Sequence, residues 1–212
     1  QRQMCIRDST YTGINTVSVG ILSISTDRNL GAVPGSTTAT SITLSGGVLQ
    51  ATGAATLDAK RGITMTAASG LAATSGNTLT VNGIVDGAFA LTINGASQTG
   101  AVTLAGANTY SGSTTVNAGT LNITNGGGLG TTAAGTTVNS GATLDLINVT
   151  VGSEAITLAG GTLADATSSL AGDVALTANS TIAVTNAADT FTMSGIISGG
   201  FSVSKTGAGT LV

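Results

Sequence analysis

Short runs in which apolar residues alternate with Thr, Ser or Ala recur along the chain. Such runs occur at residues 79–81, 102–104, 121–123, 144–146 and 156–158. This period of two, with its enrichment in β-branched residues, predicts short strands that are buried on one face. Gly and Asn follow the runs every few residues, and both tolerate the positive φ angles of tight corners. Neither a long helical period nor a membrane-spanning run of about 18 apolar residues occurs, so the pattern predicts an all-β chain.

The chain also repeats itself over longer distances. Three pairs of segments align without gaps: 10–31 with 109–130, 41–49 with 155–163, and 77–96 with 189–208. The three offsets are unequal, so the long repeat tolerates insertions.

A shorter repeat lies inside the long one. Residues 114–121 recur as residues 136–144, at an offset of 22 and with one inserted residue. A unit of this length is too short to close its own core and must stack on its neighbours, which is typical of a solenoid.

We therefore expect residues 10–212 to form a single β-solenoid. At ~20 residues per rung the segment would make roughly ten rungs, and a strand spacing of ~4.8 Å would give a rod roughly 50 Å long. Equivalent Thr, Ser and Asn side chains would stack into ladders, and Val, Leu, Ile and Ala would fill a narrow core. The sequence begins and stops inside a repeat, so we expect a fragment truncated at both ends, with unpaired edges there.

Composition narrows the chemistry that the chain can perform. Only 7% of the residues are charged and 2% are aromatic, and the chain has no His and one Cys. Catalysis by Ser–His or Cys–His pairs and the usual zinc ligand sets are therefore excluded. Six basic and nine acidic residues, a net charge of −3, leave no footprint for nucleic acid. With 41% apolar residues the chain does not have the composition of a disordered protein.

The first nine residues differ in character from the rest. They contain the only Cys, Cys5, together with two of the six basic residues and one of the nine acids. They resemble a forward translation of the adapter carried by transposase-based sequencing libraries. We interpret residues 1–9 as such an artefact and exclude them from the fold, so Cys5 carries no information about a redox compartment.

Residues 103–121 read Thr-Leu-Ala-Gly-Ala-Asn-Thr-Tyr-Ser-Gly-Ser-Thr-Thr-Val-Asn-Ala-Gly-Thr-Leu. This stretch resembles the passenger-associated transport repeat, also called the autotransporter-associated β-strand repeat. Residues 205–212 resemble the start of another copy, and residues 10–22 resemble the end of an earlier one. The chain departs from the repeat at Ser97-Gln98-Thr99, an insertion, and at Ile14-Asn15, which weakens the first copy.

The resemblance implies a right-handed parallel β-helix in an autotransporter passenger of a Gram-negative bacterium, displayed at the cell surface or secreted. It implies a C-terminal β-barrel translocator of the same polypeptide, beyond Val212. It also implies a structural or adhesive role, in which the repeats support stepwise folding and outer-membrane translocation. The partner would be a host or neighbouring cell surface, and no catalytic residue, cofactor or metal is expected.

The acids are the candidates for an enzymatic alternative, a β-helical polysaccharide lyase or hydrolase. After residue 9 they are Asp27, Asp58, Asp86, Asp145, Glu154, Asp165, Asp173 and Asp189. Lys and Arg are absent from residue 62 to residue 204, and no two of these acids lie closer than eight residues apart. The spacing of Asp145 and Asp165, near one rung, can place them on adjacent strands, but a catalytic pair also needs a defined mutual geometry. We expect the acids to be solvated turn residues and the chain not to be an enzyme.

Glycines and aromatic residues have structural interpretations. The run at residues 126–130 lacks the Asp of a calcium-binding repeat and the Lys-Ser/Thr of a phosphate loop, so we expect a turn. Tyr11 and Tyr110 occupy equivalent repeat positions, as do Phe89 and Phe201, and we expect these aromatic residues to have packing roles.

Lys205 aligns with Ile93 in the long repeat. A position that accepts either residue is expected to face outward or to end a strand. Ile93→Lys should therefore be mild, whereas Leu91→Lys should unfold the local rung.

Two other adhesin architectures are alternatives to the autotransporter. One is a repeat adhesin of another secretion route, and the other is an array of immunoglobulin-like sandwiches, whose domains are ~100 residues long. The 22-residue repeat and the drift of the offset from 99 to 114 argue against sandwiches, because their length is more constant.

Overall fold

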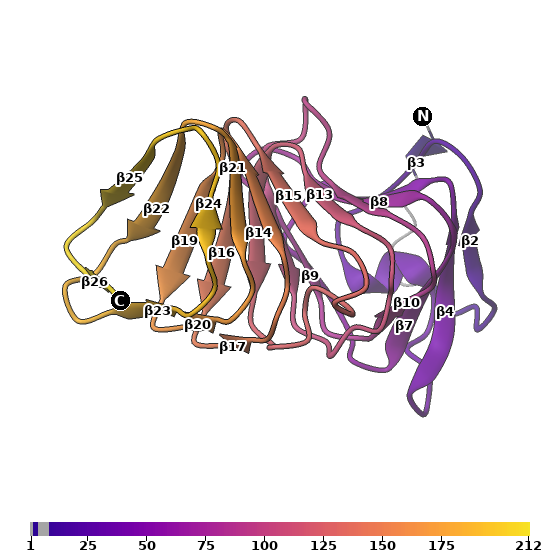
Figure 1. Cartoon of the computed structure of the whole chain (residues 1–212). Coiled ribbons are helices and arrows are strands. Elements are labelled where there is room, and N and C mark those ends of the chain that lie inside the picture. Colours follow the sequence, from indigo (N-terminus) through magenta and orange to yellow (C-terminus); the bar gives the residue numbers. More distant parts are fainter. Residues whose placement is uncertain (1, 4–8) are drawn as a thin grey trace.

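The structure is a computed structural model that describes residues 2–3 and 9–212 (Figure 1). The chain coils along one axis, and its two termini lie at opposite ends of the coil (Figure 1). The interpretation of residues 1–9 as a library artefact falls mostly outside the described residues, as does Cys5, and it stays a prediction.

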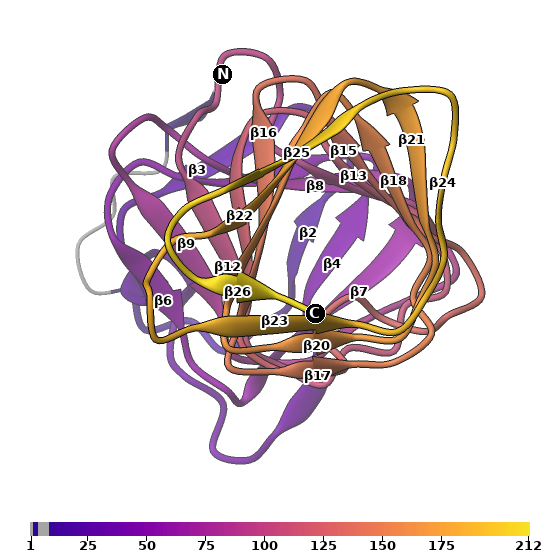
Figure 2. The same cartoon turned by 60° about the vertical axis from the view of Figure 1, so that its left-hand side comes forward.

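Each turn of the coil passes through three sides (Figure 2). The first face is a ten-stranded parallel sheet of β1 (Arg2–Gln3), β3 (Ile21–Ile24), β5 (Val48–Ala51), β8 (Ser69–Ala73), β11 (Leu91–Ile93), β13 (Thr114–Val116), β15 (Thr136–Asn139), β18 (Ile156–Ala159), β21 (Val174–Ala178) and β24 (Ile197–Ser198). The second face is an eight-stranded parallel sheet of β6 (Ala55–Leu57), β9 (Thr78–Val81), β12 (Ala101–Leu104), β14 (Gly119–Ile123), β16 (Ala142–Ile147), β19 (Thr162–Ala166), β22 (Ser180–Val184) and β25 (Val203–Thr206).

The third side is divided along the coil. Its N-terminal sheet contains β2 (Asn15–Val17), β4 (Thr38–Ser45), β7 (Arg61–Ala67) and β10 (Val85–Asp86). Its C-terminal sheet contains β17 (Thr150–Val151), β20 (Ser169–Leu170), β23 (Thr190–Met193) and β26 (Thr210–Leu211). Loops close the turns between these two sheets. A single 3-10 turn, η1 (Asp27–Leu30), is the only helical segment of the described residues.

The all-β solenoid prediction is confirmed, but the number of turns is about eight and not ten. Strands of one face pair with strands one turn later, as Thr115 pairs with Thr137. The shortest step on the first face joins Thr157 to Ala175, and the longest joins Leu22 to Leu49. The rung length expected from the sequence was too short for most turns, and this gave too many rungs.

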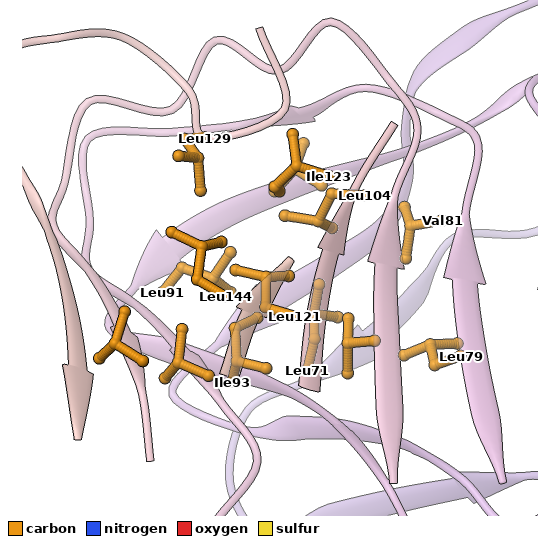
Figure 3. Close-up of a cluster of buried hydrophobic side chains, with 14 of the residues drawn as sticks. Leu71, Leu79, Val81, Leu91, Ile93, Leu104, Leu121, Ile123, Leu129 and Leu144 are labelled. Carbon is orange, nitrogen blue, oxygen red and sulfur yellow. The ribbon is translucent and has the colours of Figure 1, made fainter. Parts of the chain in front are cut away.

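Two columns of inward side chains form the core along the second face. One column contains Ala55, Leu79, Val102, Leu121, Leu144, Leu163, Ile182 and Lys205. The other contains Leu57, Val81, Leu104, Ile123, Leu146, Asp165 and Val184. The aliphatic members are at most 1% exposed, and several are drawn in Figure 3. Burial of each Val, Leu or Ile side chain contributes about 1.5–3 kcal/mol to the stability of the fold. The positions that the alternating pattern predicted to be buried are the ones that form this core.

Outward side chains stack in columns as well. The first face carries a column of Thr92, Thr115, Thr137 and Thr157. The second face carries a column of Thr120, Thr143, Thr162 and Thr181. The predicted amide ladder is present between Asn117 and Asn139, where Asn139 Nδ2 donates to Asn117 Oδ1 at 2.8 Å.

The long repeat is present in the structure, but the two copies of each pair occupy different faces of the coil. The later copy begins one face further along the winding than the earlier copy. Residues 41–49 contribute to β4 on the third side and β5 on the first face, whereas residues 155–163 contribute to β18 on the first face and β19 on the second. The corners nevertheless keep their conformation. Gly87 has a φ of 119° and the aligned Gly199 a φ of 118°. At each of them a Cβ would collide with a backbone carbonyl of the preceding turn.

Ile93 ends a strand, which was one of the two alternatives expected for it, but it does not face outward. Ile93 lies on β11 with its side chain in the core, at 0% exposure. Lys205 lies on a different face, on β25, where it ends an inward column. It is exposed there because β25 is the last strand of its sheet. Its Nζ donates to the carbonyl oxygens of Gly207, at 2.7 Å, and of Gly209.

The two ends of the coil differ. Near the N terminus, η1 contacts β3 and β6 and buries Leu30 at 1% exposure. In the last turn, Ile196, Phe201, Val203 and Val212 are 40% to 69% exposed. Open apolar edges are therefore present at the C-terminal end of the described chain, and we expect the chain to self-associate through them when it is expressed alone.

Candidate functional site

Asp145 and Asp165 lie on adjacent strands, β16 and β19, as their spacing suggested. The register pairs Asp145 with Ala164 and Asp165 with Leu146, so the two carboxyl side chains project from opposite faces of the sheet. A glycosidase pair must face one sugar from two sides, with its carboxyl groups about 5–10 Å apart. These two acids do not form such a pair.

Asp165 is the charged member of an inward column and is 4% exposed. Neither of its carboxyl oxygens makes a hydrogen bond of normal geometry to a described residue. Burial raises its pKa, nearby Ser168 and Thr167 donors lower it in part, and the charge of Asp189 raises it further. Burial likewise raises the pKa of Asp145, with a contribution from Asp165. The prediction of a solvated turn is wrong for Asp165.

Glu154 is a second buried acid that the sequence analysis placed in a solvated turn. It precedes β18 and is 3% exposed, and the Thr136 hydroxyl donates to its Oε1 at 2.8 Å. Burial raises its pKa to about 7, although the bond from Thr136 lowers it. Thr136 is stacked on Thr114, whose Oγ1 lies 2.8 Å from the Tyr110 hydroxyl. These four side chains form a buried polar cluster inside an apolar coil.

Arg61 is a buried cation, 2% exposed, at the start of β7. Its Nε donates to Asp27 Oδ1 at 2.7 Å. Its Nη1 and Nη2 donate to the carbonyl oxygens of Leu30 at 3.1 Å and Gly31 at 2.5 Å. The last carbonyls of a helical turn lack partners within it, so Arg61 closes the C-terminal end of η1.

The remaining sequence features concern metal ligands, the glycine run and membrane spans in the described residues. No group of three or more His, Cys, Asp or Glu side chains in this part of the chain is placed to hold a metal ion. Residues 126–130 form the expected turn, with Gly128 N donating to Asn125 O at 2.8 Å. A search of the described helices for one long and apolar enough to span a membrane finds none.

Asn94 links three successive turns through its buried amide. Its Oδ1 accepts from Ala73 N at 2.8 Å, in the preceding turn. Its Nδ2 donates at 2.9 Å to the carbonyl oxygens of Gly100, in the same turn, and Ala118, in the next. At Gly119, a Cβ would collide with Gly100 O and crowd the Asn94 amide, so the position requires glycine.

Asn108 makes an equivalent link on the third side. Its Oδ1 accepts from Val85 N at 2.9 Å, and its Nδ2 donates to Gly128 O at 2.7 Å, one turn in each direction. The side chain is 5% exposed. Sequence reasoning missed Asn94 and Asn108, because one Asn among the many turn asparagines of this chain has no distinguishing signal.

The two tyrosines confirm the packing role expected of them. Tyr110 is 0% exposed, and its hydroxyl pairs with Thr114. In the first copy the Tyr11 hydroxyl donates to Asn15 in the same way. The backbone carbonyl of each tyrosine accepts a 2.9 Å hydrogen bond from an amide of the following turn. Asn15, which weakened the sequence match, therefore replaces Thr114 in function.

The phenylalanines do not follow the tyrosines. Phe89 is 41% exposed although a further turn follows it, so the packing prediction is wrong at this position. Phe201 is 50% exposed and lies in the last turn.

Comparison with known proteins gives one match. Residues 96–123 match the family model of the passenger-associated transport repeat. The matched segment includes β12, β13 and β14, together with Asn108, Tyr110 and Gly119. No match was found among the curated proteins or among the solved structures. The matched repeat and the β-solenoid together fit the repeat region of an autotransporter passenger.

Proposed function

We propose that this β-solenoid is a structural segment of an autotransporter passenger whose turns fold one on another during transport across the outer membrane. In this proposal the same polypeptide carries a C-terminal translocator, and the passenger is displayed at the surface of a Gram-negative cell or released from it. The matched transport repeat supports both parts of the proposal.

The observation that carries the proposal is the local nature of the contacts. Sheet pairings on all three sides join strands one turn apart. Asn94 and Asn108 also reach only the turns next to their own. A turn that leaves a pore therefore finds all its partners in a turn that is already folded, as in other solenoids.

Transport experiments test this role through Asn108. The chain is placed between a secretion signal and a translocator domain, and surface exposure is measured by protease accessibility of whole cells. Asn108→Ala leaves Val85 N and Gly128 O without their side-chain partner, at a cost of about 1–3 kcal/mol for each buried group left unsatisfied. We expect less passenger at the surface and more retained in the periplasm.

Asn186→Ala is the matched control, because the Asn186 side chain donates to exposed Asp189 in the same turn and not to a neighbouring turn of the described chain. It should reach the surface as the parent does. Equal surface delivery of Asn108→Ala, in spite of a measured loss of stability, would contradict a folding-coupled role for the repeats.

At the surface we propose adhesion or scaffolding. The flat outward columns of Thr support this role, because they offer hydroxyl groups at regular spacing along two faces. Cells that display the chain should adhere to host or neighbouring cells more than cells that display the translocator alone. The enzymatic alternative lacks a pair of carboxyl groups that face each other among the described residues. Release of reducing or unsaturated sugars from an acidic polysaccharide by this chain would support that alternative.

A further inference from the structure

A trough of about 330 Å³ lies on the outer surface of the first face, over β8. Its floor contains Gly70 and Ala72, the outward residues of β8. Its sides contain Val48 of β5 and Thr92 of β11, and the loop after β11 adds Gln98. We refer to this hollow as the β8 trough. Its volume is at the lower end of the usual ~300–1,000 Å³ of small-molecule sites.

The loop that bounds the β8 trough is longer than its counterpart in the next turn. Residues 94–100 connect β11 to β12, whereas only residues 117 and 118 connect β13 to β14. The longer loop includes the insertion Ser97-Gln98-Thr99, where the chain departs from the transport repeat. Gln98 is held in this loop because its Oε1 accepts from Gly95 N at 2.9 Å and its N donates to Gly95 O at 3.0 Å. The insertion therefore gives this turn a wall that the next turn lacks.

Gly70 keeps the floor of the trough open. Its register partners in the outward column are Val48 and Thr92. A glycine inside a strand weakens the strand and often marks a bulge, a bend, or a site where a ligand or another backbone comes close. β8 pairs with both neighbours without a register shift, and the φ angle of Gly70 is not positive.

Close approach of another backbone does not explain this glycine either. The nearest atoms to a Cβ added at Gly70 would be Val48 Cγ2 at 3.0 Å, and Val48 Cγ1 and Thr92 O at 3.4 Å. All three belong to the two adjacent strands, and 3.4 Å is an ordinary contact distance. Of the usual reasons for a glycine inside a strand, the approach of a ligand is the one that remains.

Two polar groups in the wall of the trough are available to a ligand. Gln98 Nε2 and Thr92 Oγ1 make no hydrogen bond to any described residue, and both side chains are partly exposed. The other two polar side chains of the lining, Ser69 and Asn94, are already bonded to backbone groups. An amide N–H and a hydroxyl both donate to a carbonyl oxygen. The trough therefore offers donors to a neutral acceptor.

The charge around the trough favours a neutral ligand. No ionisable side chain among the described residues lines it, and the first-face strands from β3 to β24 contain no charged residue. An anion in the trough would lose hydration without a cation in the wall to pair with. The apolar part of the lining includes Val48, Leu71 and Ala72, which favours contact with a hydrocarbon chain.

We infer that the β8 trough binds a small neutral molecule that has a short unbranched aliphatic chain and a carbonyl group. The chain lies over Gly70 and Ala72, between Val48 and Thr92, and the carbonyl oxygen accepts from Gln98 Nε2. The volume accommodates about ten non-hydrogen atoms, since one water molecule takes about 30 Å³ of liquid. This site is independent of the proposed role in transport.

Gln98→Glu is the discriminating variant for the carbonyl group of the ligand. It keeps an oxygen that accepts from Gly95 N, and with it the loop, but replaces the Nε2 donor with a second acceptor. We expect a neutral amide to bind roughly tenfold more weakly or worse. Ser97→Ala, at an exposed position of the same loop, is the matched control and should leave binding unchanged.

Gly70→Ala tests the floor of the trough. The added methyl group occupies space that the ligand chain needs, so binding should weaken roughly tenfold. The protein should stay folded, because the closest atom, Val48 Cγ2, belongs to a side chain that can adjust. Gly152→Ala is the control, since nothing lies within 4 Å of a Cβ added there. Urea unfolding of both variants establishes that they are folded.

Binding is measured by NMR titration of the backbone amides of Gly70, Thr92 and residues 95–98. The probes are hexanamide, acetamide, hexanoate and galactose, which separate the effects of chain, carbonyl group and charge. We expect saturable shifts with hexanamide, at a Kd of about 1 mM, and weaker binding of the other three. The inference is wrong if hexanamide gives no saturable shifts, if any other probe binds as tightly, or if either Gln98→Glu or Gly70→Ala binds hexanamide with unchanged affinity.

Discussion

Glu154 shows at the residue scale how an apolar coil tolerates an acid. Its carboxyl is 3% exposed and has the Thr136 hydroxyl as donor. Burial raises its pKa from 4.5 to about 7, so the folded protein holds this proton over a range in which the unfolded chain releases it. Tyr110 belongs to the same cluster, and burial raises its pKa as well. Glu154 is therefore the group of this cluster that titrates near neutral pH.

The free energy of unfolding should fall as the pH rises from about 4.5 to about 7, by at most about 3 kcal/mol from this group. Stabilisation is complete below the unfolded-state pKa and is lost as the folded-state carboxyl ionises. Glu154→Gln keeps an acceptor for Thr136 and removes the titration. Urea unfolding between pH 4 and pH 8 gives the free energy of unfolding of the parent and of Glu154→Gln. The pH dependence that Asp145 and Asp165 contribute is common to both proteins and cancels in the difference between them. Parallel curves for the two proteins would show that the pKa of Glu154 is the same in the folded and the unfolded chain.

Thr167 is a strained residue on the corner after β19. Its φ is 56°, a left-handed value that costs an L-residue about 1–2 kcal/mol and is least suited to a β-branched one. In the turn before, Asn148 adopts a φ of 52° and donates from its backbone amide to Ala166 O at 2.8 Å. Asn is the residue type that tolerates this conformation best after Gly.

Thr167→Asn should therefore raise the free energy of unfolding by about 1 kcal/mol. The exposed bond from Thr167 Oγ1 to Asp189, 3.1 Å long, is lost but contributes little in water. Thr132→Asn, in an exposed turn with negative φ, is the control and should be neutral. A lower denaturant midpoint for Thr167→Asn would show that the bond to Asp189 outweighs the backbone strain.

At the scale of single strands, alternation predicted the faces well and alignment predicted them poorly. The inward residues of β14 and β16, such as Leu121 and Leu144, follow directly from the period of two. Ile93 was expected to face outward or to end a strand because it aligns with Lys205. It ends β11 but faces the core, and the two aligned copies lie on different faces of the coil. The local pattern of strand and corner is conserved between copies, but a sequence match carries no information about rotation around the axis.

The structure therefore changes the expectation for β11. Ile93→Lys and Leu91→Lys should both destabilise the turn by about 3 kcal/mol or more, because each buries an unpaired ammonium in a fully buried column. Thr92→Lys, on the outward side of the same strand, should be tolerated. Limited proteolysis compares the three variants. A protected Ile93→Lys beside a cleaved Leu91→Lys would return Ile93 to the outward face.

Buried polar residues were the part of the candidate site that sequence reasoning did not reach. The tyrosines were found because they recur at repeat positions, and in the structure each tyrosine hydroxyl bonds to the side chain four residues later. Glu154 and Asn108 lie outside the strands and outside the aligned copies, and Asp165 is an acid at an inward position of β19 where the neighbouring turns have Leu146 and Val184. Their burial depends on which side of the coil the chain has reached, which only the complete winding determines.

For the molecule as a whole, the length of a turn is the quantity that the fold must preserve. Residues 114–135 make one complete turn, because Thr136 is the register partner of Thr114. Deletion of residues 114–135 joins Ser113 to Thr136 and lets β15 take the place of β13 beside β11. The shortened chain should remain folded with one turn fewer, and its length should fall by ~4.8 Å, the rise of one strand. Some stability is lost with the bond between Asn108 and Gly128.

Deletion of residues 114–124 is the contrasting variant, because it removes half a turn and only half as many residues. It places the turn at residues 125–130 where β13 would pair, so apolar residues meant for the core face solvent and the following strands lose their register. Circular dichroism and small-angle scattering of the two proteins separate the outcomes. Because each turn of a solenoid contacts only its neighbours, the larger deletion should be the milder one. The opposite order would mean that the chain folds around long-range contacts that a solenoid does not have.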